Sequence, residues 1–206
     1  MRKLLGFGAV SLMLLGGPAG AEDVSEAQIL KALQAPAMPR TRSLSISPPA
    51  TAAPSADAAF VDSLRNKPTR SLSTGDREKL DTVAATKPQI DLAMEFDMNS
   101  DELRGEALVT ANKLGKALSN SAMKDQTFVI AGHTDAKGSE SVNQTLSERR
   151  AEAVRQFLVR NYQIPAANLI SVGYGKAHLK NASDPLGREN RRVQAVNLLQ
   201  VKTAGR

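Results

Sequence analysis

The sequence predicts an α+β fold, a two-layer βαβαββ sandwich in which helices pack on a mixed four-stranded sheet, preceded by a disordered tether. Two observations lead to this prediction. Between residues 88 and 201, apolar residues switch between strand and helix spacing in the order strand, helix, strand, helix, strand, strand. Before residue 73 the chain is rich in Pro, Ala and Ser and lacks such periodicity. We therefore expect one ordinary domain after a long polar segment.

Residues 1–21 have the features of a signal peptide. Two basic residues begin the segment, an apolar run from Leu4 to Leu15 follows, and Ala19 and Ala21 form the A-x-A pattern that signal peptidase accepts. The apolar run is shorter than the roughly 20 residues that a helix needs to span a bilayer. We therefore predict cleavage after Ala21, a periplasmic location, and no transmembrane span in the mature chain.

Residues 22–72 are predicted to be a low-complexity tether. A short helix over residues 24–34 would place Ile29, Leu30 and Leu33 on one side, but it is marginal without a partner. The Pro-rich remainder buries too little apolar surface to offset the entropy of ordering. The pentapeptide TRSLS occurs at 41–45 and again at 69–73. It is either a docking motif, with an outer-membrane protein as the partner considered, or the product of biased composition, which we favour.

The remaining elements follow from spacing and capping. Residues 73–87 are predicted to form a lead-in helix, because Ser and Thr precede acidic residues at its start. The domain itself is expected over residues 88–201. Its six predicted elements are a strand in QIDLAMEF, a helix in NSDELRGEALVTANKLGKALSN, a strand in TFVIAG, a helix over 139–162, and strands in LISVGYG and RRVQAVNLL.

Composition excludes several classes of function. The formal charge is +6, but Lys and Arg are scattered and aromatic residues make up only 3% of the chain. A nucleic-acid-binding surface is therefore not supported. The chain has no Cys, which rules out a disulfide and a thiolate nucleophile. No cofactor and no metal are predicted.

One charged residue breaks the pattern of the helix at 139–162. On a helical projection, Arg150 falls in the middle of the apolar stripe that contains Leu146 and Phe157. A buried arginine without a partner costs several kcal/mol, so we expect a carboxylate to approach it. Asp135, at the end of the preceding strand, is the best candidate. The pair is either a structural ion pair that closes the loop or part of a binding site, and the residues alone leave both open.

An exported hydrolase or metal-binding protein that uses His133 and Asp135 is the alternative. A catalytic zinc needs three protein ligands, and the chain offers only His178 as a second histidine. Ser139 or Ser141 could complete a triad on paper, but the G-x-S-x-G motif is absent. We therefore predict that the protein is not an enzyme.

The stretch GHTDAKGSESVNQTLSERRAEAV resembles the signature of the OmpA-like C-terminal domain, the peptidoglycan-binding module of Gram-negative envelope proteins. The family pattern is G-H-T-D, a small loop, and then N-x-x-L-S-x-x-R-A. It matches Gly132 to Asp135 and then Asn143, Leu146, Ser147, Arg150 and Ala151. FDMNSDEL from Phe96 and GRENRRV from Gly187 are similar to two further junctions of the family. The resemblance covers about residues 88–200.

The resemblance implies a function. It predicts a βαβαββ domain that binds peptidoglycan non-covalently through the diaminopimelate residue of the peptide stem and contributes to envelope integrity at the cell wall or outer membrane. The aspartate that matches Asp135 would take an ammonium group, and the arginine that matches Arg150 would take a carboxylate. The predicted ligand-binding residues are Asp135, Arg150, Asn143, Phe96, Asp97 and Arg191.

Overall fold

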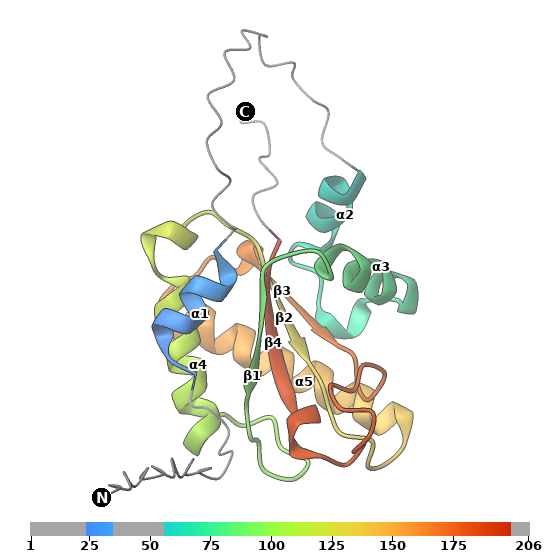
Figure 1. The fold of residues 1–206 in the computed structure, drawn as a ribbon. Coiled ribbons are helices and arrows are strands. Elements are labelled where there is room, and N and C mark those ends of the chain that lie inside the picture. The colour runs from blue at the N-terminus through green and yellow to red at the C-terminus, as the bar shows by residue number, and fades with distance from the viewer. Residues whose placement is uncertain (1–23, 35–55, 199–206) are drawn as a thin grey trace, which may run out of the picture.

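The structure is a computed structural model that describes residues 24–34 and 56–198 (Figure 1). Its centre is a four-stranded sheet with the strand order β1-β4-β2-β3. β4 is antiparallel to both of its neighbours, whereas β2 and β3 are parallel. The strands are β1 (Gln89–Ala93), β2 (Phe128–Gly132), β3 (Leu169–Gly173) and β4 (Arg192–Asn197). The predicted α+β class, with helices packed on a mixed four-stranded sheet, is confirmed.

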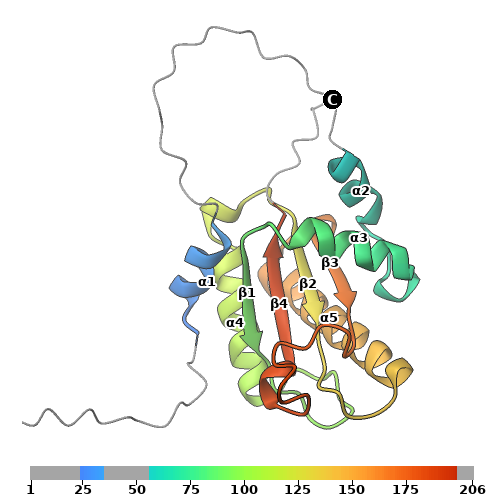
Figure 2. The same ribbon diagram turned by 45° about the vertical axis from the view of Figure 1, so that its right-hand side comes forward.

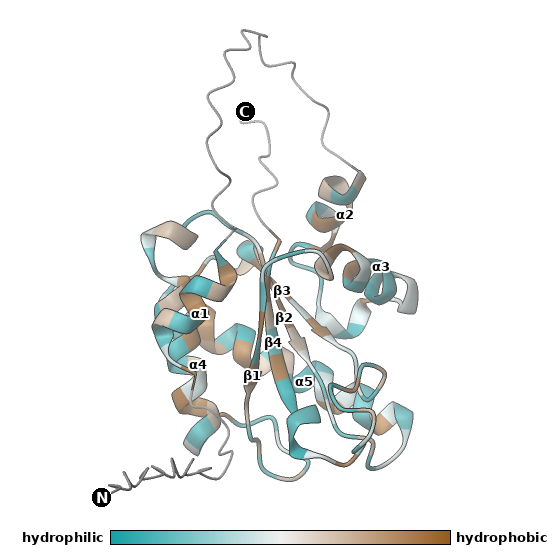
Figure 3. Ribbon diagram, in the orientation of Figure 1, coloured by the Kyte–Doolittle hydropathy of each residue, from teal (hydrophilic) through white to brown (hydrophobic). Residues whose placement is uncertain are grey.

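Three helices cover one face of the sheet: α1 (Glu26–Leu33), α4 (Gly105–Leu118) and α5 (Glu140–Tyr162). Ser139 caps α5, and its Oγ accepts a hydrogen bond from the backbone N–H of Val142 at 3.3 Å. The apolar sides of these helices meet the alternate strand residues that face them, such as Ile130. Figure 3 shows the mixture of hydrophobic (brown) and hydrophilic (teal) residues along α1 and α4. In α1, Ile29 and Leu33 are fully buried in this cluster. This short helix therefore has the packing partner that it needs for stability.

The start of α5 lies directly on the sheet, at a pair of glycines. Gly132 and Gly173 are register partners in β2 and β3. A Cβ on Gly132 would clash with the backbone carbonyl of Ser147, and one on Gly173 with the backbone of Glu148. Ser147 is fully buried, and its Oγ accepts a hydrogen bond from the N–H of Gly175 at 2.8 Å. This close approach holds the start of α5 against the end of the sheet where β2 and β3 finish.

The other face of the sheet is covered by a second apolar cluster. It is built from α2 (Ala56–Leu64), the 3₁₀ turn η1 (Thr69–Ser71) and α3 (Thr74–Ala84), and Figure 2 shows α2 and α3 on the side away from α1 and α4. Val61, Leu64 and Leu80 are buried there against β2, β3 and β4. Both faces of the central strands are thus apolar and covered.

Residues 56–72 differ from the prediction, which assigned them to a disordered tether. In the structure they form α2 and η1. The reason is tertiary, because so short a helix is stabilised by packing on the sheet rather than by its own propensity. The continuously apolar run of β2 was the signal for a second layer, since such a strand is buried on both faces.

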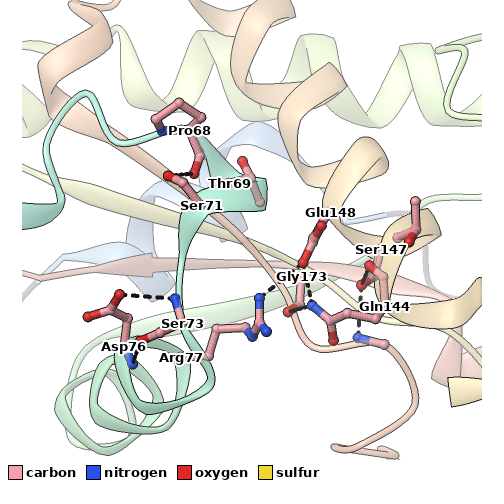
Figure 4. Close-up of polar contacts among 12 residues, drawn as sticks. Pro68, Thr69, Ser71, Ser73, Asp76, Arg77, Gln144, Ser147, Glu148 and Gly173 are labelled. Carbon is pink, nitrogen blue, oxygen red and sulfur yellow. Dashed lines mark hydrogen bonds and ion pairs between the residues drawn. The ribbon is translucent and has the colours of Figure 1, made fainter. Parts of the chain in front are cut away.

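Polar contacts fasten this second layer to α5 and β3 (Figure 4). Arg77 of α3 forms an ion pair with Glu148 of α5 at 3.0 Å. Thr69 hydrogen-bonds to Ser171 of β3 and donates to Glu152 of α5 at 3.1 Å. In the second TRSLS copy, therefore, Thr69 is a buried structural contact. The first copy, the predicted signal peptide, residues 22–23 and 35–55 of the predicted tether, and residues 199–201 lie outside the described residues.

None of the helices within residues 24–34 and 56–198 is long and apolar enough to cross a membrane. The division of the chain into signal peptide, tether and domain stays a prediction.

Candidate functional site

Three loops meet at one end of the sheet and enclose a cavity of about 700 Å³. One loop follows β1, one follows β2 and leads into α5, and the third leads into β4. Five of the six predicted site residues line this cavity: Phe96, Asp135, Asn143, Arg150 and Arg191. The sixth, Asp97, does not line it but contributes its backbone carbonyl to the support of Arg150.

Arg150 is 6% exposed, so its charge is largely removed from water. Its Nε donates to the carbonyl oxygen of Ser100 at 2.9 Å, and its Nη2 donates to that of Asp97 at 3.2 Å. The guanidinium carbon lies 4.9 Å from the centre of the Phe96 ring. Burial, and then the charge of Arg191, lower the pKa of Arg150 to about 10. Arg150 therefore remains a cation at neutral pH, held by neutral groups.

Asp135 and Arg150 do not form the structural ion pair that the residues left open as one of two alternatives. Asp135 pairs instead with Arg191, whose Nη1 lies 2.9 Å from Asp135 Oδ2. The other carboxylate oxygen accepts from the backbone N–H of Lys137 at 3.1 Å. The helical projection showed the need for a partner to Arg150, but it could not show that backbone carbonyls of the loop at 97–100 meet that need.

Asn143 shapes the loop between β2 and α5. It is 3% exposed, and its Nδ2 donates to the carbonyl oxygen of Lys137 at 2.9 Å. Gly138, next in the loop, has a φ of 93°, a conformation that L side chains rarely adopt. These features shape the loop that leads into α5, and Asp135 of this loop lines the same cavity as Arg150 of α5.

His133 does not line this cavity. It is 3% exposed and stacks on Tyr174, with 5.5 Å between the ring centres. Burial, and then the charge of Arg192, lower its pKa to about 3. The alternative site that combines His133 with Asp135 is therefore not assembled. Within the described residues, no group of three or more His, Asp or Glu side chains is placed to hold a metal ion.

An apolar rim surrounds the cavity, and the sequence pattern does not predict it. Met98, Val142 and Leu186 line it and are 84%, 54% and 61% exposed. Val142 lies on the predicted apolar stripe of its helix, so its position alone suggested burial. Met98 and Leu186 lie in loops, where periodicity carries no signal. The cavity thus joins charged groups of both signs to exposed apolar surface.

These features define a class of protein: an α+β domain whose loops form a cavity lined by charged side chains of both signs and by exposed apolar side chains. Residues 95–192 match the sequence model of the OmpA family, and this part of the chain is an OmpA-family domain.

The chain is similar to several curated proteins. It is 32% identical over 109 residues to outer membrane porin F of Pseudomonas aeruginosa, which covers 52% of this chain and 31% of that protein. It is 39% identical over 83 residues to outer membrane protein A of Klebsiella pneumoniae, covering 40% of this chain and 24% of that one. The chain thus spans about a third or less of the length of these relatives.

Solved structures also resemble the chain. The OmpA-like domain of FopA1 from Francisella tularensis is 19% identical, with a TM-score of 0.45, over 52% of this chain and 69% of that one. The peptidoglycan-associated lipoprotein from Burkholderia pseudomallei is 21% identical, with a TM-score of 0.41, over 57% of this chain and 93% of that one.

Proposed function

We propose that this domain binds peptidoglycan non-covalently, through the diaminopimelate residue of the peptide stem, and so contributes to the integrity of the cell envelope. The single observation that carries the proposal is the placement of Asp135 and Arg150 on one cavity without an ion pair between them. The family match supports the class of ligand, since the resemblance implies peptidoglycan as the partner.

The chemistry of the cavity suits a zwitterion. Arg150 is buried and charged but is held by carbonyl oxygens, so a ligand carboxylate would supply the anion that the protein does not. Arg191 lines the same cavity and can share that carboxylate. An ammonium group of the ligand would then take the oxygens of Asp135 that Arg191 now contacts. The fixed planar fork of arginine favours this geometry over the point charge of a lysine.

Binding of this kind breaks no bond in the ligand. We therefore propose that the protein is a periplasmic binder, exported by residues 1–21 and associated with the cell wall or outer membrane. An outer-membrane protein is the partner that we propose for the N-terminal segment. Crosslinking from residues 35–55 in intact cells would identify that partner.

Two variants test the site. Arg150→Lys keeps the charge but loses the fork, and Asp135→Ala removes the acceptor, so each should weaken co-sedimentation with purified sacculi about tenfold or more. Arg160→Lys, on the exposed side of α5, and Asp57→Ala, on α2, are the matched controls and should bind normally.

Melting curves of all four variants separate a ligand site from a structural role. A normal melt with binding lost supports the proposal, whereas folded variants that still sediment with sacculi would remove both residues from the site. Release of soluble fragments from sacculi by the wild-type protein would favour the hydrolase alternative.

A further inference from the structure

A second hollow adjoins the cavity that Asp135 and Arg150 line. It has a volume of about 450 Å³ and is lined by Asn99, Ser141, Val142, Thr145, Leu146 and Arg149. Three of these residues, Asn99, Val142 and Leu146, also line the first cavity. The two hollows therefore share a wall, and a ligand in the first can continue into the second along the protein surface.

The geometry of α5 divides the polar groups between the two hollows. At about 100° per residue, Val142 and Leu146 form a ridge along the helix. Arg150 lies on one flank of this ridge and lines the first cavity. Thr145 and Arg149, four residues apart, lie on the other flank and line the second hollow. The second hollow thus has polar groups of its own, which the first does not share.

Arg149 is held in place but remains available to a ligand. Its Nη2 donates to the carbonyl oxygen of Asn99 at 3.0 Å, and Asn99 itself has a φ of 56°, which turns the loop toward α5. Its Nε lies 3.7 Å from Asp101, a long ion pair between two side chains that are each about half exposed. No acidic residue lines the hollow, whereas a guanidinium and two hydroxyls do.

The apolar part of the hollow is the ridge itself. Val142 is 54% exposed and Leu146 is half-buried, so both offer contact area to a small apolar group. A cation whose ion pair with Asp101 is long and about half exposed, beside an exposed aliphatic ridge, fits a carboxylate that sits next to a methyl or similar group.

We propose that this hollow is a second subsite of the same binding site and takes a carboxylate borne by a small apolar residue, the group that a C-terminal alanine presents. The carboxylate pairs with Arg149, and the methyl group packs on Val142 and Leu146. The inference rests on the proposed function, because in a peptidoglycan stem such an alanine follows the diamino acid that the first cavity takes.

Two soluble stem peptides test the subsite by isothermal titration calorimetry. One is the tripeptide that ends in diaminopimelate, and the other is the tetrapeptide with an added D-alanine. The wild-type mature chain should bind the tetrapeptide about fivefold more tightly, as expected for one partly exposed ion pair. Arg149→Gln should remove this difference and leave the affinity for the tripeptide unchanged, whereas the control Arg160→Gln should behave as wild type. Thr145→Val, which keeps Arg149, should reduce the preference without abolishing it.

The outcomes separate the subsite from the proposed function. Equal affinity of the wild type for both peptides overturns the subsite alone. An equal loss for both peptides in Arg149→Gln also overturns it, because Arg149 would then only position the loop at Asn99. If an attached N-acetylmuramic acid raises the affinity and Arg149→Gln removes that gain, the hollow takes the sugar and the proposal fails. No binding of either peptide, together with no sedimentation with sacculi, overturns the proposed function and the subsite with it.

Discussion

The two faces of the sheet are covered in different ways. On one face, α4 and α5 connect the strands, and their apolar sides join a single large cluster. On the other face, α2 and α3 precede every strand, bury fewer large side chains, and are joined to α5 and β3 by the Arg77–Glu148 ion pair and by hydrogen bonds of Thr69. In the first layer, α4 and α5 are thus positioned by the strands that they connect, whereas α1 on that face and the whole second layer are held by their contacts. One sheet can therefore carry helices that its own strand connections position and helices that are held on it only by packing and polar contacts.

The largest effect should come from the first layer. Leu158 of α5 belongs to that cluster and is fully buried, with 0% of its surface exposed. Leu158→Ala should lower the free energy of unfolding by about 3–5 kcal/mol, because it removes apolar contacts and leaves a cavity in a rigid core. The loss should appear in urea unfolding as one transition shared by all probes. Leu108→Ala, 37% exposed on α4, is the control and should stay within about 0.5 kcal/mol of wild type.

The matching change on the second face is Leu80→Ala in α3. Leu80 is also fully buried, so the side chain removed is the same size. We expect a smaller loss, about 2–3 kcal/mol, since a short helix at the edge of the structure can shift to fill part of the cavity. Hydrogen exchange should show faster exchange in α2 and α3 while β2 stays protected. An equal rise of the exchange rates in α4 and α5 would show instead that both layers unfold as one unit.

The two layers also differ in how well the sequence predicts them. The helical spacing of apolar residues around Leu114 in α4, and around Leu158 in α5, predicts in each case a helix with one buried side. The strands that each helix joins determine its position on the sheet. α2 carries no such signal, because its own residues Val61 and Leu64 are buried by strands that lie far along the chain. In the site, the sequence predicts both Asp135 and Arg191 as ligand-binding residues but not the ion pair between them, which joins residues 56 positions apart. A contact over that distance depends on the register of β2 with β4, which periodicity alone does not give.

His133 offers a pH test at the end of the second face, where it stacks on Tyr174. Its pKa is lowered to about 3 in the folded protein, whereas an unfolded histidine titrates near 6.5. The unfolded chain therefore takes up a proton first, and the stability that this group contributes is full above about pH 6.5 and is lost as pH falls toward 3. Between pH 7.5 and 5.5 the wild type should lose about 1.4 kcal/mol through His133. His133→Phe keeps a ring on Tyr174 and should remove most of this slope in urea titrations at the two pH values. An unchanged slope would show that water reaches the His133 ring.

The smallest expected change in the free energy of unfolding concerns the ion pair of Arg77 and Glu148, one of the contacts between α3 and α5. Both side chains are mostly buried, at 20% and 15% exposed, and the distance is 3.0 Å. Glu148 keeps a second donor, because Gln144 Nε2 lies 2.7 Å from the same oxygen (Figure 4). Loss of Arg77 therefore does not strand the carboxylate, and a double-mutant cycle of Arg77→Gln with Glu148→Gln should give a coupling energy of only about 1 kcal/mol. The same cycle followed by hydrogen exchange should place that loss in α3 rather than in α5. A coupling near zero would mean that the apolar contacts of Leu80 hold the second layer alone, whereas a value of about 3 kcal/mol would mean that the pair behaves as a buried one and that the layer is a full part of the fold.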